Sequence, residues 1–304
     1  MESVTLMLNP VPPYDFTLST AIFSSGDPHI RKAEDGRWWQ VISIGGRLVL
    51  AKVSSAGTTN HPVLKVELRS DTGISSQERE KAGEIISRIL NLDDYLAPFY
   101  QEVRDDPVLH AVTKRLRGLK VPTTPTVFEA LVDSIIEQQI ALTVARLLET
   151  RLTKMFGDKL VVAGQDYYAF PVPERIAAGK PEQFRACGLS AMKGEYLRKA
   201  AEQIAGGGVD LERMKEVKDP EQVIEELCTM KGVGRWTAEL VLLRGMHRLD
   251  IIPADDLGLQ RTITGRYQIP GKISGAEIRR IAERWGDWKG LAAYYLLVAE
   301  RMGV

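Results

Sequence analysis

Two neighbouring carboxylates, Asp255 and Asp256, follow Pro253 and precede a helix-like stretch that starts at Leu257. A buried carboxylate in such a place can stabilise positive charge that develops on a reacting group, and it can orient a water molecule. Aspartate is also a preferred residue immediately before a helix, where its side chain accepts a hydrogen bond from a free backbone N–H. Residue type and position leave both roles open for this pair.

A second group of residues lies upstream of the carboxylates. Gly232 and Gly234 flank Val233, and Lys231 and Arg235 are their basic neighbours. Glycine permits a tight turn and leaves no side chain between the backbone and a ligand. A helix that starts near Arg235 directs its free N–H groups in front of the turn, and such a terminus attracts phosphate. Two helices joined by this Gly-x-Gly turn predict a sequence-independent binding site for a nucleic-acid backbone, although an isolated Gly-x-Gly triplet is common in ordinary loops.

The elements that must position these residues differ between the two ends of the chain. Residues 1 to about 70 contain short β-rich runs at 38–44, 47–53 and 63–68, with Gly45-Gly46 as a two-residue hairpin signal. A helix is predicted at 76–90, because Ala82, Ile85, Ile86 and Ile89 fall on one face. From Leu92 onward the spacing is helical, with helices predicted at 107–116, 126–156 (one long helix or a broken pair), 173–178, 181–187, 190–205, 220–230, 237–245, 256–267, 274–285 and 288–302.

Composition bounds the class of protein. A length of 304 residues suggests about two domains, and 40 basic residues balance 40 acidic ones. Bulk charge therefore does not predict a coat for nucleic acid, although a local basic face is compatible with this balance. Cys187 and Cys228 are the only cysteines, too few for a cysteine-rich metal site. With no long apolar run and no signal-like start, we expect a soluble intracellular protein.

These patterns together predict an α+β chain. We expect an N-terminal domain over 1–91, made of an antiparallel sheet and a helix, and an all-α domain over 92–304 that contains the hairpin at 220–245.

Five short motifs in order along the chain carry a more specific resemblance. They are PPYDF at 12–16, IEQQI at 136–140, MKGVG at 230–234, PADD at 253–256 and WGDWK at 285–289. With them, nearly the whole chain resembles the DNA glycosylases of the helix-hairpin-helix (HhH-GPD) superfamily, and within it the 3-methyladenine DNA glycosylase II (AlkA) type. The iron–sulfur branch of that superfamily needs four closely spaced cysteines, which this chain lacks.

The resemblance implies roles for the carboxylates and for Trp236. It aligns Asp256 with the catalytic aspartate, which would stabilise positive charge on the deoxyribose, and leaves Asp255 as the helix cap. Trp236 stands where bifunctional relatives carry a Schiff-base lysine. Since tryptophan cannot form an imine, we expect a monofunctional N-glycosyl hydrolase without lyase activity. Trp236 would stack on the extruded base and favour cationic purines; the alternative is a core tryptophan on an amphipathic helix.

The resemblance also implies a base pocket and a DNA-contacting surface. Leu240, Leu297 and Ile22 occupy pocket positions where the family carries aromatic side chains, and Phe23, Tyr294 and Tyr295 are near enough in sequence to supply aromatic surface. Gln139 is the predicted wedge that fills the space left by the flipped nucleotide, the alternative being a polar helix end. The DNA contacts implied for the hairpin are Lys231, Gly232, Val233, Gly234, Arg235 and Thr237, mostly through backbone amides.

The predicted function is release of alkylated purines from damaged double-stranded DNA by a monomeric enzyme that leaves an abasic site. We expect no cofactor and no membrane partner. We also expect no metal site made of side chains, because the histidines are scattered along the chain. The resemblance allows a monovalent cation bound to carbonyl groups of the hairpin. Lys193 and Arg198 are expected on a solvated or DNA-flanking face. The alternatives are a glycosylase for another lesion, such as hypoxanthine or an oxidised purine, and a non-catalytic DNA-binding module.

Overall fold

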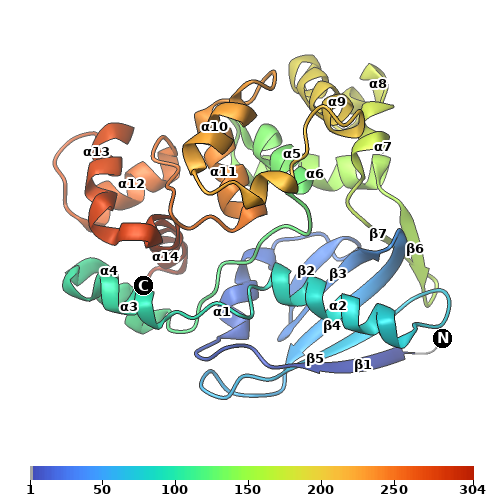
Figure 1. The fold of residues 1–304 in the computed structure, drawn as a ribbon, viewed down its shortest axis with the longest axis horizontal. Coiled ribbons are helices and arrows are strands. Elements are labelled where there is room, and N and C mark those ends of the chain that lie inside the picture. Colours follow the sequence, from blue (N-terminus) through green and yellow to red (C-terminus); the bar gives the residue numbers. More distant parts are fainter. Residues whose placement is uncertain (1–2) are drawn as a thin grey trace.

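The N-terminal strands form one antiparallel sheet in the computed structural model, which describes residues 3–304 (Figure 1). Its order is β1-β5-β4-β3-β2, with bounds β1 Ser3–Leu8, β2 Arg31–Glu34, β3 Arg37–Ile44, β4 Arg47–Ser55 and β5 Leu64–Arg69. The predicted strands at 38–44, 47–53 and 63–68 are confirmed as β3, β4 and β5. Gly45 and Gly46 form the two-residue turn between β3 and β4, both with positive φ. The outer strands β1 and β2 were not predicted from the sequence.

One helix, α2 (Ser76–Ile89), covers one face of this sheet. It begins with a capping box in which Ser75 and Glu78 satisfy each other's backbone N–H groups. Its buried residues include Ala82 and Ile86, which belong to the same core as Trp38 of β3. The predicted helix at 76–90 is therefore confirmed, and its apolar face is the one expected from helical spacing.

Residues 92–304 are mostly helical. The helices are α3 Ala97–Glu102, α4 Pro107–Arg115, α5 Val127–Glu137, α6 Leu142–Phe156, α7 Pro173–Ala177, α8 Pro181–Ala186, α9 Ala191–Ala205, α10 Pro220–Cys228, α11 Arg235–Met246, α12 Leu257–Arg266, α13 Gly275–Ala282 and α14 Lys289–Met302. A short α1 (Phe16–Thr20) precedes them in the N-terminal part. The predicted stretch 126–156 is a broken pair, because the backbone leaves the helical conformation at Gln138, with a ψ of 125°, and at Gln139, with a φ of +57°. No helix among residues 3–304 is long and apolar enough to cross a membrane.

One expectation for this region is wrong: it is not all-α. Strands β6 (Lys159–Val162) and β7 (Gln165–Tyr168) form a hairpin after α6. Leu160 and Val162 pack with Val41 and Leu50, which lie on the face of the sheet opposite to α2. Side chains alternate between the faces of a strand, so Val41 and Leu50 point away from the core that contains their neighbours Ile42 and Val49. The hairpin thus covers an apolar patch that would otherwise face water.

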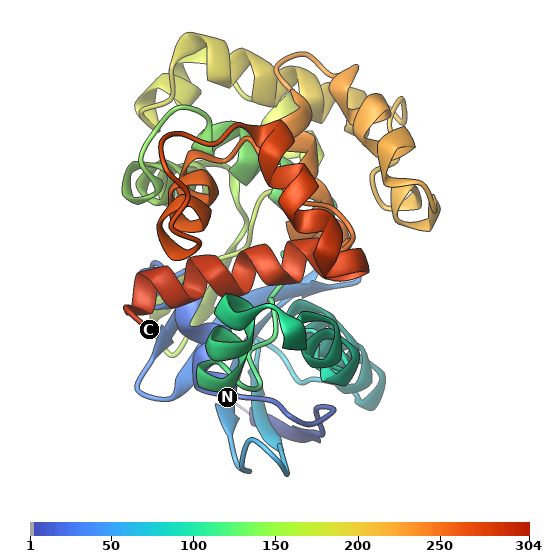
Figure 2. The same ribbon diagram turned by 90° about the vertical axis from the view of Figure 1, so that its left-hand side faces the viewer.

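The helices enclose two separate apolar cores. One lies among α5, α6, α9, α10 and α11, and the other among α3, α4, α12, α13 and α14. Figure 2 shows α14 running across the molecule, with the N-terminal part, α3 and α4 on one side of it. The place where these two cores and the N-terminal part meet is where a large cavity opens.

Candidate active site

The turn between α10 and α11 has a backbone geometry that requires glycine at position 232. Gly232 has a φ of +87°, and a Cβ at this position would lie 2.2 Å from the ring of Tyr196. Gly234 caps α11 without any side-chain hydrogen bond to the first turn of that helix. Since the first N–H groups of a helix have no partner within it, the start of α11 can bind an anion. Val233 is buried in the core formed by α5, α6, α9, α10 and α11, and it does not line the cavity described below.

Asp256 lies directly before α12 and beside Trp236 of α11. Its Oδ1 accepts a hydrogen bond from the backbone N–H of Leu259 at 2.8 Å. Its Oδ2 accepts one from Nε1 of Trp236 at 3.2 Å. The cap and the indole fix the orientation of the carboxylate, which is only partly buried. The expectation that Asp255 is the cap is wrong: Asp256 is the cap, and Asp255 is exposed and accepts a hydrogen bond from Arg279 at 3.0 Å.

A cavity of about 1370 Å³ extends from Asp256 between the two helical cores and the N-terminal part. The structure brings most of the predicted residues to its wall. Those that line it are Ile22, Phe23, Gln139, Gly232, Gly234, Trp236, Thr237, Leu240, Asp256 and Leu297. Trp236 and Leu240 are one turn apart on α11, so they face the cavity from the same side of that helix. Leu257, which is 71% exposed, lies at the wall beside Asp256 and had not been predicted.

The expectation that Tyr295 supplies aromatic surface to the base pocket is wrong. Its side chain is fully buried, its hydroxyl donates a hydrogen bond to the carbonyl of Leu119 at 2.7 Å, and its ring packs edge-on against Phe99. It does not line the cavity. Tyr294, the neighbouring residue on α14, does. The two side chains diverge because successive residues of a helix point about 100° apart, a difference that sequence distance alone cannot resolve.

The two basic residues of the predicted hairpin are held in ion pairs. Lys231 lies 2.9 Å from Glu195 of α9. Arg235 lies 2.6 Å from Glu221 of α10 and 3.0 Å from Glu239 of α11. Neither residue lines the cavity. These pairs connect the hairpin to its supporting helices, so both cations have a structural partner before any ligand arrives.

The turn that carries Gln139 is supported by two residues whose positions the sequence reading missed. Gln138 donates hydrogen bonds from Nε2 to the carbonyl of Gly232 at 2.8 Å and to the hydroxyl of Thr237 at 3.0 Å. Lys193 of α9 donates from Nζ to the carbonyls of Ile136 and Gln138, each at 2.7 Å. Lys193 is therefore not simply a solvated charge. These contacts could not be predicted from local sequence patterns, because they join segments that are far apart in the chain.

The cavity also contains carboxylates that the sequence reading did not single out. Glu129, Asp133 and Glu137 of α5 and Glu149 of α6 line it, together with Arg31, Arg146, Arg244 and Arg301. The four-residue spacing of Glu129, Asp133 and Glu137 along α5 was a signal that these groups share one face of the helix, although it does not show which of them has a partner. Among residues 3–304, no group of three or more histidines, cysteines or carboxylates is arranged to hold a metal ion.

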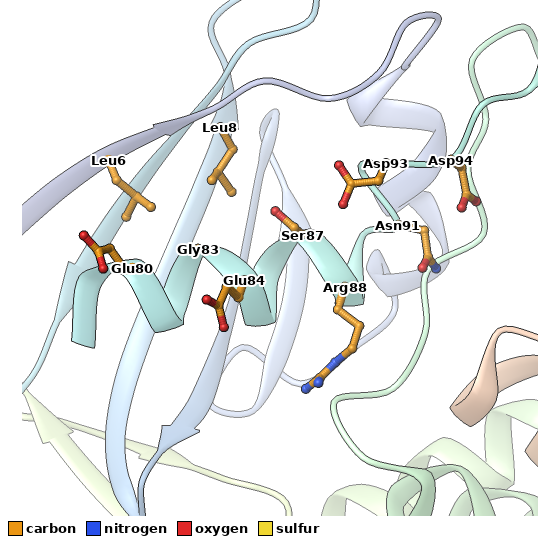
Figure 3. Close-up of a pocket in the computed structure, with 10 residues that line it drawn as sticks. All are labelled: Leu6, Leu8, Glu80, Gly83, Glu84, Ser87, Arg88, Asn91, Asp93 and Asp94. Carbon is orange, nitrogen blue, oxygen red and sulfur yellow. The ribbon is translucent and has the colours of Figure 1, made fainter. Parts of the chain in front are cut away.

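A second hollow lies in the N-terminal part, between β1 and α2 (Figure 3). Leu6 and Leu8 of β1 point toward α2 at Gly83, where a Cβ would come within 3.1 Å of Leu6. Its rim carries acidic side chains, including Glu80, Glu84 and Asp93. No residue of the predicted site lines this hollow.

Known proteins resemble the chain over the region that contains this site. The model of the HhH-GPD superfamily base excision DNA repair protein family matches residues 132–287, a span that includes the hairpin and both aspartates. The chain is 32% identical over 260 residues to the DNA-3-methyladenine glycosylase of Bacillus subtilis, covering 84% of each chain. It is 31% identical over 183 residues to DNA-3-methyladenine glycosylase 2 of Escherichia coli, covering 60% of this chain and 61% of that one. The solved 3-methyladenine DNA-glycosylase from Archaeoglobus fulgidus superposes with a TM-score of 0.86 at 28% identity, covering 98% of this chain and 99% of that one.

Proposed function

Because the chain belongs to the HhH-GPD superfamily of base excision DNA repair proteins, we propose for it the activity of a monofunctional alkylpurine DNA glycosylase. Such an enzyme extrudes 3-methyladenine or 7-methylguanine from damaged duplex DNA and hydrolyses the N-glycosidic bond. The product is an abasic site. The observation that carries the proposal is Asp256, held at the cavity wall by its own helix and by Trp236.

Asp256 can supply the electrostatic part of this reaction. Breaking the bond between base and sugar develops positive charge on the deoxyribose, and a fixed carboxylate beside the sugar stabilises it. Since Oδ1 already accepts the cap hydrogen bond and Oδ2 the indole hydrogen bond, the carboxylate needs little reorganisation as the charge forms. Trp236 then has two functions, to orient Asp256 and to offer its ring to the extruded base.

The absence of lyase activity is supported by the residues of the cavity wall. Within the described part of the chain the wall contains arginines but no lysine. Lysine is the side chain that forms a Schiff base with the sugar, whereas the arginine guanidinium stays protonated and is not a nucleophile. Water is therefore the proposed acceptor of the sugar.

The DNA-binding surface is proposed from the same geometry. The backbone amides at Gly232, Gly234 and Thr237 would bind a phosphate, and Gln139 would enter the space left by the flipped nucleotide. Gln139 is exposed on the turn that Gln138 ties to the hairpin, so wedge and phosphate site form one rigid unit. We propose that a monomer suffices, because one chain contains both.

A glycosylase for another lesion is the second candidate. It is favoured by Ile22, Leu240 and Leu297, which line the cavity with aliphatic rather than aromatic surface. Base release should be measured from duplexes that carry 7-methylguanine, hypoxanthine or 8-oxoguanine, with and without alkali afterwards. Release of the methylated purine, with strand breaks only after alkali, is expected. Strand breaks without alkali would contradict the monofunctional assignment, and binding of abasic DNA with no base release would favour a non-catalytic module.

A further inference from the structure

Four carboxylates from α5 and α6 line the same cavity as Asp256. Glu129, Asp133 and Glu137 are spaced by four residues, so they form one stripe along α5 that faces the cavity. Glu149 of α6 lines the cavity with them. Such a concentration of acidic groups in the interior is costly unless each group has a partner.

Two of the four carboxylates have a cationic partner and two do not. Arg31 lies 2.8 Å from Glu129, and Arg244 lies 2.8 Å from Glu137. Asp133, which is only 8% exposed, forms no hydrogen bond or ion pair with residues 3–304. Nor does Glu149, whose Oε1 is buried without a partner. The second oxygen of Glu129, a residue that is 3% exposed, is also buried and unpartnered.

The two unpaired groups tend to hold protons when the cavity is empty. Burial raises the pKa of Asp133 well above its ordinary range, and Glu149 and Glu129 raise it further, while Arg31 lowers it. Burial raises the pKa of Glu149 to about 7. The charged groups that face Glu149 are Glu137 of α5, which also raises it, and Arg244, Arg31 and Arg146, which lower it. A cation that entered between Asp133 and Glu149 would favour their ionised forms.

The position of this pair suits contact with an extruded base. Trp236, Leu240 and Arg244 line the cavity along one face of α11, and Trp236 contacts Asp256 while Arg244 contacts Glu137. Trp236 and Arg244 are separated by two turns, or roughly 12 Å of helix axis. Asp133 and Glu149 line the same cavity as these residues, so they belong to the wall that would surround a purine whose sugar lies at Asp256. Leu240 and Leu297 line this wall with aliphatic surface, which itself offers no partner for the charge of such a base.

We propose that Asp133 and Glu149 determine the specificity of this pocket, by offering unpaired carboxyl groups to an extruded base and selecting bases that carry positive charge over neutral ones. The inference rests on the proposed glycosylase function and assigns its selectivity to a carboxyl pair rather than to aromatic surface. A N-alkylated purine with delocalised positive charge is the matching ligand, because it forms charge-assisted hydrogen bonds with these groups.

The test compares single-turnover release of 7-methylguanine, which is cationic, with release of hypoxanthine, which is neutral. Asp133→Asn and Glu149→Gln keep the side-chain shape and remove the acid. Each is expected to slow 7-methylguanine release by about tenfold, the scale of one hydrogen bond to a charged group, and to change hypoxanthine release much less. Glu84→Gln, at an exposed position on α2, is the matched control and should change neither rate. If both variants slow both substrates equally, the pair is structural and the inference is wrong.

A pH series keeps the inference testable even if one variant folds poorly. Glu149 is neutral below its pKa of about 7 and ionised above it, so cation binding should strengthen as pH rises from 6 to 8. The rate of 7-methylguanine release by the parent, divided by the rate for Glu149→Gln, should rise over this range. Titration of the substrate affects both rates equally, so it cancels in this ratio. A flat ratio contradicts the inference while leaving the glycosylase function intact. A parent that releases neither base contradicts the glycosylase function itself.

Discussion

At the scale of single residues, Asp256 combines a structural and a chemical role that substitutions can separate. Asparagine keeps an oxygen that can accept the hydrogen bond from Leu259, so Asp256→Asn should retain the stability of the parent. Alanine removes that acceptor, and Asp256→Ala should lower the free energy of unfolding by about 1 kcal/mol. Both variants lose the negative charge and should slow base release by about a hundredfold or more. Urea denaturation and single-turnover base release measure the two effects.

The matched control for Asp256 is its neighbour. Asp255→Asn alters an exposed carboxylate that contacts Arg279 and does not cap α12, so base release should remain within about threefold of the parent, as for most surface changes. Binding of abasic DNA should persist in all three variants. If Asp256→Asn releases base as fast as the parent, the catalytic assignment is wrong.

Individual site residues could be predicted from sequence to the extent that helical register determines their direction. Trp236 and Leu240 follow from their spacing on one helix. Tyr295 was misplaced because a one-residue error rotates a helical side chain out of the cavity and into the core. Asp133 and Glu149 were missed for another reason: whether a buried carboxylate has a partner depends on residues from other helices, and spacing along the chain carries no such information.

At the scale of elements, the two glycines of the hairpin differ in whether the structure tolerates a side chain at their position. Gly232→Ala places a Cβ at a φ of +87° and 2.2 Å from the ring of Tyr196, so the free energy of unfolding should fall by more than about 1 kcal/mol. At Gly234 the φ is −104° and nothing lies within 4 Å of an added Cβ. Gly234→Ala should keep the stability of the parent and weaken DNA binding alone, because its methyl group faces the proposed phosphate. Denaturation and fluorescence anisotropy with abasic duplex distinguish the two; equal stability of both variants would contradict this account.

Lys193 is a positioning residue for the Gln139 turn. Its ammonium group binds two carbonyls at the end of α5, and Lys193→Met would leave both without this donor. We expect base release to slow by about tenfold because the wedge is no longer held in place. DNA affinity at the hairpin should change little, since Gln138 still contacts Gly232. Lys199→Met, on the same helix, is the control. Weakened DNA binding with unchanged release from the bound complex would show that Lys193 acts on DNA directly.

Elements were predictable where a local pattern repeats. The helices of the C-terminal part and strands β3 to β5 have clear spacing, and a glycine turn joins β3 to β4. Strands β6 and β7 are only four residues each, and they are stabilised by burial of Leu160 and Val162 against Val41 and Leu50. A pattern that short has no period to detect. Its partner lies more than a hundred positions away in sequence, so only the folded chain reveals it.

At the scale of the whole molecule, the N-terminal sheet is fastened to the helices at several places. The β6–β7 hairpin packs on the sheet, and Arg31 of β2 contacts Glu129 of α5 at 2.8 Å. Asp94, in the segment that leads from α2 into the helical part, lies 2.9 Å from His247 at the end of α11. Because the cavity is lined by residues from both parts, these contacts fix its shape. The sheet therefore contributes to the site by holding Ile22, Phe23 and Arg31 against the helices.

Lys120 is a buried cation at the junction between the N-terminal part and the helices, and it should make stability depend on pH. Its ammonium group donates to the carbonyls of Val11 at 2.9 Å and Leu92 at 2.7 Å. Burial lowers its pKa from 10.5 to about 8, although Asp94 and Asp93 act in the opposite direction. Between these values the unfolded chain binds more protons at this site than the folded chain, so the contribution of Lys120 to the free energy of unfolding rises with pH.

The free energy of unfolding of the parent minus that of Lys120→Met should therefore be constant below about pH 8. It should rise from there toward pH 10.5, with a slope of up to about 1.4 kcal/mol per pH unit. The loss of two hydrogen bonds adds an offset that does not vary with pH. Urea denaturation of both proteins from pH 7 to 10 measures the difference, and Lys114→Met, at an exposed position of α4, is the control. A difference that stays constant over this range would mean that Lys120 keeps an ordinary pKa, and that water reaches the junction between the sheet and the helices.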